Sequence, residues 1–233
     1  MKQRGLRMNT SEHHNLTKDV MNKLRALSTC TLSDALDRVG LSGVVLGIRP
    51  TWPDCPRIAG TALTIKLGKA GDKPAHTGLL EAVDMVRSGD IIIIDNRGTL
   101  NINSWGGILT FVATKKGAEG AVIDGATRDL DDIRMLKFPV YARSIVPTTA
   151  RGRVQFEGTN VPVQCGDVRV APGDVVVADE NGVVIMPASR MNQVLEVAEK
   201  LAEIESAIIE DVKKGISATQ AHARHRYEDL TKR

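Results

Sequence analysis

The spacing of apolar residues predicts two packed helices at the start of the chain, followed by a strand. Apolar residues recur at helical spacing over 16–27, and a second helix is predicted over 33–39, with Thr31 or Ser33 as its N-cap. Residues 60–67 alternate between apolar and polar positions, which is typical of a strand with one exposed face.

Strands and helices alternate in the middle of the chain. Ile91 to Ile94 is β-branched on both faces, so we expect a central strand that is covered on both sides. Residues 96–105 carry turn and polar residues and are interpreted as a loop. The other predicted elements are helices over 77–86, 106–117 and 129–137 and strands over 121–124 and 140–143. This alternation indicates an α/β protein with parallel strand pairing.

The last third of the chain has a different pattern. Between 153 and 187, short apolar segments are separated by glycines, which predicts a strand-and-turn module packed on the parallel layer. A long amphipathic helix is then predicted over 189–214, with Gly215 ending it.

Composition and charge exclude several classes of protein. A chain of 233 residues with 42% hydrophobic content can bury a sizeable core as one large domain. The formal net charge is only +3 and the Lys and Arg residues are dispersed, which argues against nucleic acid as a ligand. The polar start lacks the apolar segment of a signal peptide, and no apolar run is long enough to span a bilayer, so we expect no membrane association.

The three cysteines, Cys30, Cys55 and Cys165, lie far apart without a CxxC pair. This spacing argues against a disulfide framework and against a thiolate zinc site. A reducing, cytoplasmic location is therefore expected.

Candidate chemistry is concentrated in two stretches. Trp105-Gly106-Gly107-Ile108-Leu109 opens a predicted helix, whose free N–H groups attract an anion, although a glycine pair is often only a turn. Farther along, a buried strand ends in Arg128 and Asp129. An arginine suits a substrate carboxylate and an aspartate suits Mg²⁺. Two plainer roles compete with these: an ion pair of Arg128 with Asp124 or Asp132, and a helix N-cap at Asp129.

Several motifs together resemble the RraA-like superfamily, which includes the 4-hydroxy-4-methyl-2-oxoglutarate and 4-carboxy-4-hydroxy-2-oxoadipate aldolases. They are Gly60-Thr61-Ala62, Gly89-Asp90, Trp105-Gly106-Gly107, Gly120 to Asp129, Pro172-Gly173-Asp174 and Asp179-Glu180-Asn181-Gly182-Val183. The aldolase branch carries a glycine, twenty residues, Arg-Asp, two residues and an acid. Gly107, Arg128, Asp129 and Asp132 match that pattern. The loop over 96–104 departs from the Gly- and Asp-rich version common in the aldolases.

The resemblance implies an α-β-β-α sandwich over residues 28–214, with an N-terminal extension over 1–27 and a C-terminal tail over 215–233. It also implies homotrimers, often paired as hexamers, with the site at the subunit boundary, and a divalent metal, Mg²⁺ or Mn²⁺. An acid from a neighbouring subunit's C-terminal end can act in such sites. Glu196, Glu199, Glu203 and Glu205 are equal candidates for that acid.

With the resemblance, the residues of the two stretches are assigned roles. Asp129 is the direct metal ligand and Asp132 acts on the metal through a water molecule. Arg128 and Asp129 are the catalytic pair. The substrate is expected to bind to Arg128 and to the backbone of Gly106, Gly107, Ile108 and Leu109.

Breaking a carbon–carbon bond beside a 2-oxoacid leaves charge on the C2 oxygen, which a Lewis acid or an iminium must hold. The nearby lysines, Lys115 and Lys116, are expected to face outward, so a metal is favoured over a Schiff base. The predicted function is a metal-dependent lyase that releases pyruvate from a 4-hydroxy-2-oxoacid, with oxaloacetate decarboxylation as a second activity. The alternative is a non-enzymatic regulator of ribonuclease activity, which the acid at Asp129 disfavours.

Overall fold

Within residues 17–71 and 75–227, which the computed structural model describes, nine strands form one mixed sheet in the order β1-β11-β10-β3-β4-β5-β6-β2, with β7 beside β3. The first half of the chain contains α1 (Lys18–Ala26), α2 (Thr29–Arg38), β1 (Val44–Val45), β2 (Arg49–Pro50), β3 (Ile58–Lys69), α3 (Ala75–Asp84), β4 (Asp90–Trp105) and α4 (Gly107–Lys116). The second half contains β5 (Gly120–Thr127), α5 (Leu130–Met135), β6 (Val140–Ile145), β7 (Val154–Thr159), β8 (Val163–Cys165), β9 (Val168–Val170), β10 (Val175–Asp179), β11 (Gly182–Met186), the 3₁₀ turn η1 (Ala188–Arg190), α6 (Met191–Lys213) and α7 (Ala218–His225).

The central strands β3, β4, β5 and β6 pair in parallel, which confirms the prediction from the strand–helix alternation. Both faces of β4 are covered. Ile92 and Ile94 pack with residues of α3, α4 and α5, while Ile91 and Ile93 face a second core on the other side of the sheet. The β-branched run is therefore fully buried, as a doubly covered strand requires.

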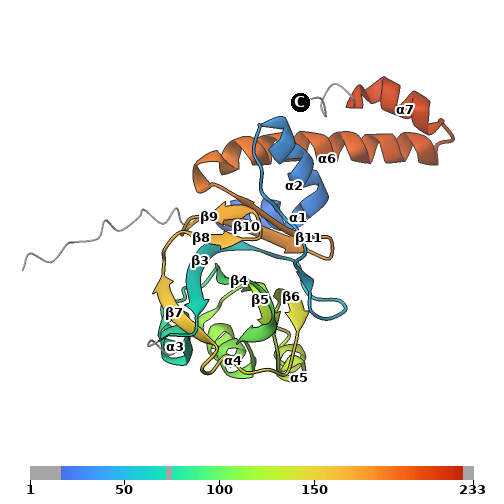
Figure 1. Cartoon of the computed structure of the whole chain (residues 1–233). Coiled ribbons are helices and arrows are strands. Elements are labelled where there is room, and N and C mark those ends of the chain that lie inside the picture. Colours follow the sequence, from blue (N-terminus) through green and yellow to red (C-terminus); the bar gives the residue numbers. More distant parts are fainter. Residues whose placement is uncertain (1–16, 72–74, 228–233) are drawn as a thin grey trace, which may run out of the picture.

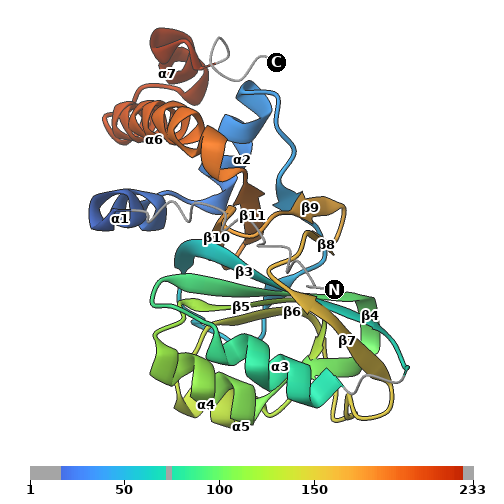
Figure 2. The same ribbon diagram turned by 90° about the vertical axis from the view of Figure 1, so that its left-hand side faces the viewer.

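Four layers follow from this packing (Figures 1 and 2). Helices α3, α4 and α5 lie on the outer face of β3 to β6, and α1, α2 and α6 lie on the outer face of β10 and β11. Between the two strand layers lies the second core, which also receives β8 and β9. The expected α-β-β-α sandwich is confirmed.

The two ends of the sheet are neighbours in the sequence. β1 pairs with β11 at one end of the sheet, β2 pairs with β6 at the other, and only residues 46–48 join β1 to β2. Ile48 in this connection is fully buried in the core between the strand layers. The short connection therefore closes the curled sheet around that core.

The prediction of a loop over 96–105 is wrong, because β4 continues through this segment to Trp105. Its polar residues remain paired with β5, with register shifts after Asp95, Thr99 and Asn103. The side chain of Asn96 is fully buried and donates to Ile102 O at 3.0 Å, so the extra residues fold back within the strand. Polar composition suggested a loop here, whereas the pairing makes a bulged strand.

Three other expectations need correction. The strand over 60–67 has no continuous exposed face. The second core, between the two strand layers, covers the face on which the alternation placed the polar residues. Most of the strand-and-turn module belongs to the main sheet, since β7 and β10 both pair with β3; only β8 and β9 form a separate pair. Helix α2 begins at Thr29 and its cap is Ser28, whose hydroxyl accepts from Thr31 N–H at 3.0 Å.

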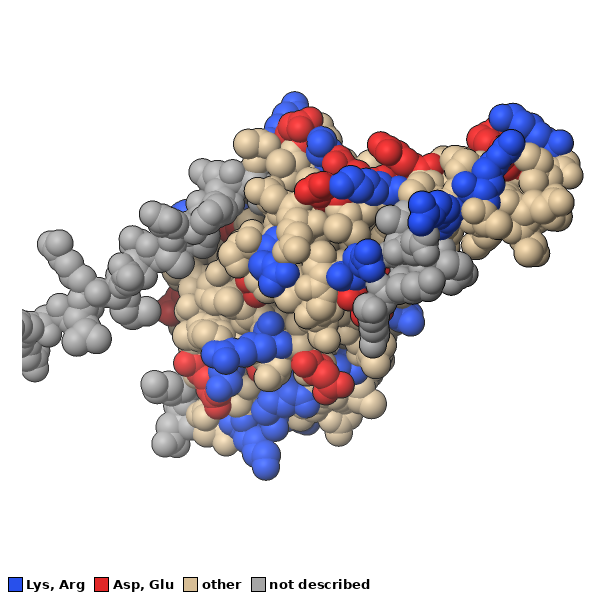
Figure 3. Space-filling view, turned by 90° about the horizontal axis from the view of Figure 1, so that it is seen from above, with Lys and Arg blue, Asp and Glu red and all other residues tan. Residues whose placement is uncertain are grey.

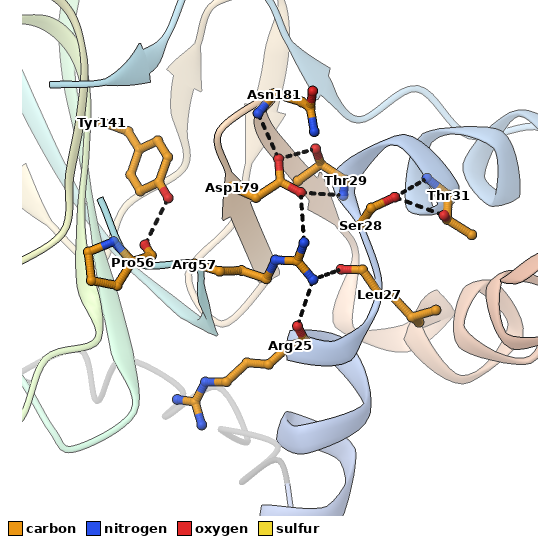
Figure 4. A network of polar contacts seen from close by, with 10 residues as sticks. All are labelled: Arg25, Leu27, Ser28, Thr29, Thr31, Pro56, Arg57, Tyr141, Asp179 and Asn181. Atoms are coloured by element: carbon orange, nitrogen blue, oxygen red, sulfur yellow. Dashed lines mark hydrogen bonds and ion pairs between the residues drawn. The ribbon is translucent and has the colours of Figure 1, made fainter. Parts of the chain in front are cut away.

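A buried carboxylate fixes the start of α2 to the turn between β10 and β11 (Figure 4). Asp179 accepts hydrogen bonds from the N–H of Thr29 at 2.9 Å, from its hydroxyl at 2.6 Å and from Asn181 N–H at 2.9 Å. Arg57 lies 3.6 Å from the same carboxylate and also donates to carbonyl oxygens at the end of α1. Burial alone would raise the pKa of Asp179, but these hydrogen bonds and the Arg57 charge outweigh it and lower the pKa.

Helix α6 extends past the body of the molecule, and α7 packs back against its far end (Figure 1). The sequence analysis gave no prediction for α7. Asp211 of α6 accepts from Arg224 at 3.0 Å and lies 3.0 Å from His225 Nε2. Acidic and basic side chains lie side by side along these helices (Figure 3), in keeping with the dispersed charge of the sequence. None of the described helices is long and apolar enough to cross a membrane.

Candidate functional site

A pocket of about 190 Å³ lies where β4 and β5 end, beside the start of α4. The two strands are held together there by the backbone, since Trp105 O accepts from Arg128 N–H at 3.0 Å. Trp105 itself is fully buried, and its indole N–H donates to Thr110 of α4 at 2.9 Å. The glycine pair and the Arg-Asp pair, 22 residues apart in sequence, therefore face the same pocket from adjacent strands.

The carboxylate of Asp129 is held at the edge of this pocket. Asp129 has a left-handed backbone (φ 58°, ψ 47°) at the N-cap position of α5, but its side chain makes no capping hydrogen bond. Instead Oδ2 accepts from Gly107 N–H at 3.0 Å. Oδ1 has no hydrogen-bond partner within the described residues, and the side chain is 41% exposed. One oxygen is thus fixed while the other is available to a ligand.

Arg128 lies beside that carboxylate. Its Nε is 3.4 Å from Asp129 Oδ2, within ion-pair distance but without hydrogen-bond geometry, and it is buried with no hydrogen-bond partner in the described chain. Within the described residues, Arg128 forms its ion pair with Asp129 and with neither Asp124 nor Asp132. Asp124 instead binds Arg143 and the Gly166 N–H. Arg128 therefore has donors available for an anion in the pocket.

The two glycines are needed for steric reasons. A Cβ on Gly106 would lie 2.5 Å from Asp129 Oδ2, and a Cβ on Gly107 would lie 2.2 Å from Asp132 Oδ2. Both carboxylates therefore pack directly onto backbone that has no side chain. The glycine pair is more than a turn, because it makes room for two acids.

The first turn of α4 supplies N–H groups to the pocket. Gly107 N–H is already used by Asp129, so it is not free for a substrate. The N–H groups of Ile108 and Leu109 have no partner within the described residues, and both residues line the pocket. A ligand carboxylate there would also benefit from the positive end of the helix dipole.

Comparison with known proteins identifies the family. The sequence model of the RraA-like family, described as Aldolase/RraA, matches residues 29–185. The chain belongs to the RraA-like family. Two relatives and one solved structure show how far the likeness extends.

The chain is 31% identical over 224 residues to protein DlpA of Legionella pneumophila, a match that covers 94% of this chain and 36% of DlpA. It therefore spans about a third of the length of that protein. It is 30% identical over 204 residues to a putative 4-hydroxy-4-methyl-2-oxoglutarate aldolase of Halalkalibacterium halodurans, covering 88% of this chain and 93% of that one. The crystal structure of an uncharacterized protein from Pseudomonas syringae pv. tomato superposes with a TM-score of 0.81 at 30% identity, covering 89% of this chain and 98% of that chain.

In this RraA-like chain the second acid of the motif lies on the far side of the glycine pair. Asp132 is exposed and lines a groove of about 360 Å³ between α4 and α5, not the pocket that Arg128 and Asp129 line. Gly107 borders both hollows. Gly107 therefore lies between the Asp132 carboxylate and a ligand bound in the pocket.

Several pocket residues were missed by the sequence analysis. His76 of α3 lines the pocket, as do Arg151, Asn103 and Ser104. The side-chain amide oxygen (Oδ1) of Asn103 and the Ser104 hydroxyl are buried without a partner in the described chain, which is typical of polar atoms that meet water or ligand. Asn103 and Ser104 fell in the segment interpreted as a loop, and no motif marks the other two residues.

The donor set fits a hard divalent cation held by few protein ligands. No three side chains of His, Cys, Asp or Glu converge on one point within 17–71 and 75–227. The open Oδ1 of Asp129 can serve as a protein ligand to such a cation. The pocket beside it is large enough for water and a chelating substrate. Mg²⁺ commonly binds in this way, through one or two carboxylates with water and substrate oxygens completing the octahedron.

Replacing Gly106 by Ala is expected to reduce activity by about 100-fold, because the new Cβ would displace the Asp129 carboxylate by a distance on the order of 1 Å. Steady-state kinetics of aldol cleavage would measure the loss. The melting temperature should change little, since Asp129 can move toward solvent. A variant with wild-type kcat/KM would show that the position of this carboxylate is unimportant.

Proposed function

We propose that this chain is a divalent-metal-dependent lyase that cleaves a carbon–carbon bond in a 4-hydroxy-2-oxoacid of the 4-hydroxy-4-methyl-2-oxoglutarate type and releases pyruvate. The observation that carries the proposal is the Asp129 carboxylate, which has one oxygen fixed by Gly107 and the other open beside Arg128. The name of the Halalkalibacterium relative supports the same substrate class.

Asp129 would hold Mg²⁺ or Mn²⁺ through Oδ1, with Asp132 contributing through water. A divalent cation in that position would supply Lewis acidity to the C2 ketone of the substrate. The rest of the binding is done by the chain itself. The amides of Ile108 and Leu109 would bind the substrate carboxylate, and the planar guanidinium of Arg128 would bind the carboxylate or the C2 oxygen.

Oxaloacetate decarboxylation is proposed as a second activity, since it develops the same negative charge on the same oxygen and differs only in the leaving group. A lysine-based mechanism has no support in the pocket, because none of its described lining residues is a lysine. Lys115 and Lys116 are exposed at the end of α4, where Lys116 pairs with Asp84.

Assembly as a homotrimer or hexamer is also proposed. The groove between α4 and α5 is apolar and borders the site, and Ile108, Met135 and Phe111 at its edges are 75%, 75% and 50% exposed. Exposed apolar side chains in one patch are typical of an interface. A neighbouring subunit there would lie next to Asp132 and Gly107.

The test is an assay of pyruvate release from 4-hydroxy-4-methyl-2-oxoglutarate and from oxaloacetate. Turnover should require Mg²⁺ or Mn²⁺, fall by at least about 100-fold with excess chelator and return when metal is restored. Turnover that is insensitive to chelator would exclude the metal. No turnover of either substrate by metal-loaded protein would contradict the lyase and favour the non-enzymatic regulator.

A further inference from the structure

The pocket contains a second arginine, Arg151, to which the proposed function gives no role. Arg151 lies in the connection between β6 and β7, far in sequence from the Arg-Asp motif, and lines the same pocket as Arg128. Its side chain is exposed, and its guanidinium has no ion pair or hydrogen bond to any residue in the described parts of the chain. A charge of this kind is available to a ligand.

The turn that carries Arg151 is well fixed. Arg153 N–H and Val154 N–H donate to Ala150 O at 3.0 and 3.3 Å, and the Arg153 guanidinium donates to Thr149 O at 3.1 Å. Arg151 N–H donates to the Thr149 hydroxyl at 3.3 Å. The position of the Arg151 backbone at the pocket is therefore set before any ligand binds, which reduces the entropic cost of using it.

The charges that line the pocket are unbalanced. The cationic side chains of Arg128 and Arg151 are on its walls, and Asp129 is the sole carboxylate among the described lining residues. Asp129 is already engaged by Gly107 N–H and lies beside Arg128, so it does not neutralise Arg151. Leu79 and Leu80 give the pocket an apolar wall as well. These features suit a short carbon chain with an anionic group at each end.

We propose that Arg151 binds the second carboxylate of a dicarboxylic 2-oxoacid and so selects dicarboxylates over monocarboxylates. This inference rests on the proposed function, which places the first carboxylate and the ketone at Arg128, Asp129 and the α4 amides. The distal carboxylate then lies toward the Arg151 turn. A guanidinium holds such a group through charge-assisted hydrogen bonds.

The test compares two ligands that cannot be cleaved, 2-oxoglutarate and 2-oxopentanoate. They have the same chain length, and 2-oxopentanoate carries a methyl group where 2-oxoglutarate carries its second carboxylate. Their dissociation constants are measured by calorimetry with Mg²⁺ present, on the full chain, for the wild type, Arg151→Gln, Arg151→Lys and Arg169→Gln. Arg169 is an exposed arginine of β9 outside the pocket and serves as the matched control.

Arg151→Gln is expected to weaken 2-oxoglutarate binding by about 10- to 100-fold and to leave 2-oxopentanoate within about twofold of wild type. Arg151→Lys should fall between the wild type and Arg151→Gln, because it keeps the charge but loses the fork geometry. Arg169→Gln should match the wild type. In turnover, Arg151→Gln should raise KM for 4-hydroxy-4-methyl-2-oxoglutarate while kcat changes little.

The proposal is overturned if the wild type binds the two ligands equally, if it binds neither, or if Arg151→Gln weakens both to the same extent. The binding measurements test the Arg151 subsite independently of whether the protein has lyase activity. Pyruvate release with an unselective Arg151 would keep the proposed function and reject the subsite. Selective, Arg151-dependent binding without turnover would keep the subsite and reject the lyase.

Discussion

Replacing Asp129 by Asn is expected to lower kcat/KM for pyruvate release by about 10³-fold or more, which corresponds to about 4 kcal/mol of transition-state stabilisation. The amide oxygen of Asn can still accept from Gly107 N–H, so the local fold should persist. What the variant loses is the negative charge that faces the pocket. The same substitution should weaken Mn²⁺ binding measured by paramagnetic resonance, which does not depend on turnover.

The matched control is Asp131→Asn. Asp131 is an exposed acid in the first turn of the same helix and does not line the pocket. It should keep both activity and metal affinity near those of the wild type. If Asp129→Asn behaved like this control, the proposed role of Asp129 as a metal ligand would be wrong.

Replacing Asp179 by Asn is expected to destabilise the protein by about 2–4 kcal/mol at neutral pH, the second large effect that the structure predicts. The side chain is 4% exposed and accepts three hydrogen bonds, so an amide NH₂ would oppose donors of Thr29 or Asn181. Denaturant unfolding of the two proteins would measure the difference. Kinetic constants per folded molecule should be unaffected, because Asp179 lies outside the pocket.

The Asp179 effect should also depend on pH. The pKa of Asp179 is lowered in the folded protein, so its contribution is fully present above the ordinary aspartate pKa of about 4 and is lost as the pH falls through the lower folded value. The stability difference between wild type and Asp179→Asn should therefore shrink below about pH 4. A difference that stays constant down to about pH 2 would show that the ionised form is not what stabilises the network.

Apolar spacing predicted helices and strands well where the period and length of the apolar pattern determine how the element packs. The β-branched run at 91–94 and the long helix that ends before Gly215 are examples. It failed over 96–105, because a bulged strand can carry the polar residues of a loop when its neighbour supplies the pairing. Short-range pattern does not contain that information, since the partner strand lies more than twenty residues away.

The same limit of short-range pattern explains which residues of the candidate site could be predicted from the sequence. Gly107, Arg128 and Asp129 could be grouped in advance because one strand pair brings their motifs together. Arg151 and His76 could not, since they reach the pocket from a turn after β6 and from α3. The side-chain direction of Asp129 was also beyond the sequence, which allowed an N-cap equally well. A left-handed backbone at that residue turns the carboxylate toward Gly107 instead.

The bulged part of β4 lies between two fixed points. Asp95 pairs with Asp124 before it and Trp105 pairs with Thr127 after it, so ten residues of β4 span a distance that β5 covers in three. Length changes in 96–104 can be absorbed between these points without shifting Gly106 relative to Arg128. Substitutions, insertions and deletions in this segment are therefore expected to change the residues around the pocket while leaving the geometry of the Gly-Gly and Arg-Asp pairs unaltered.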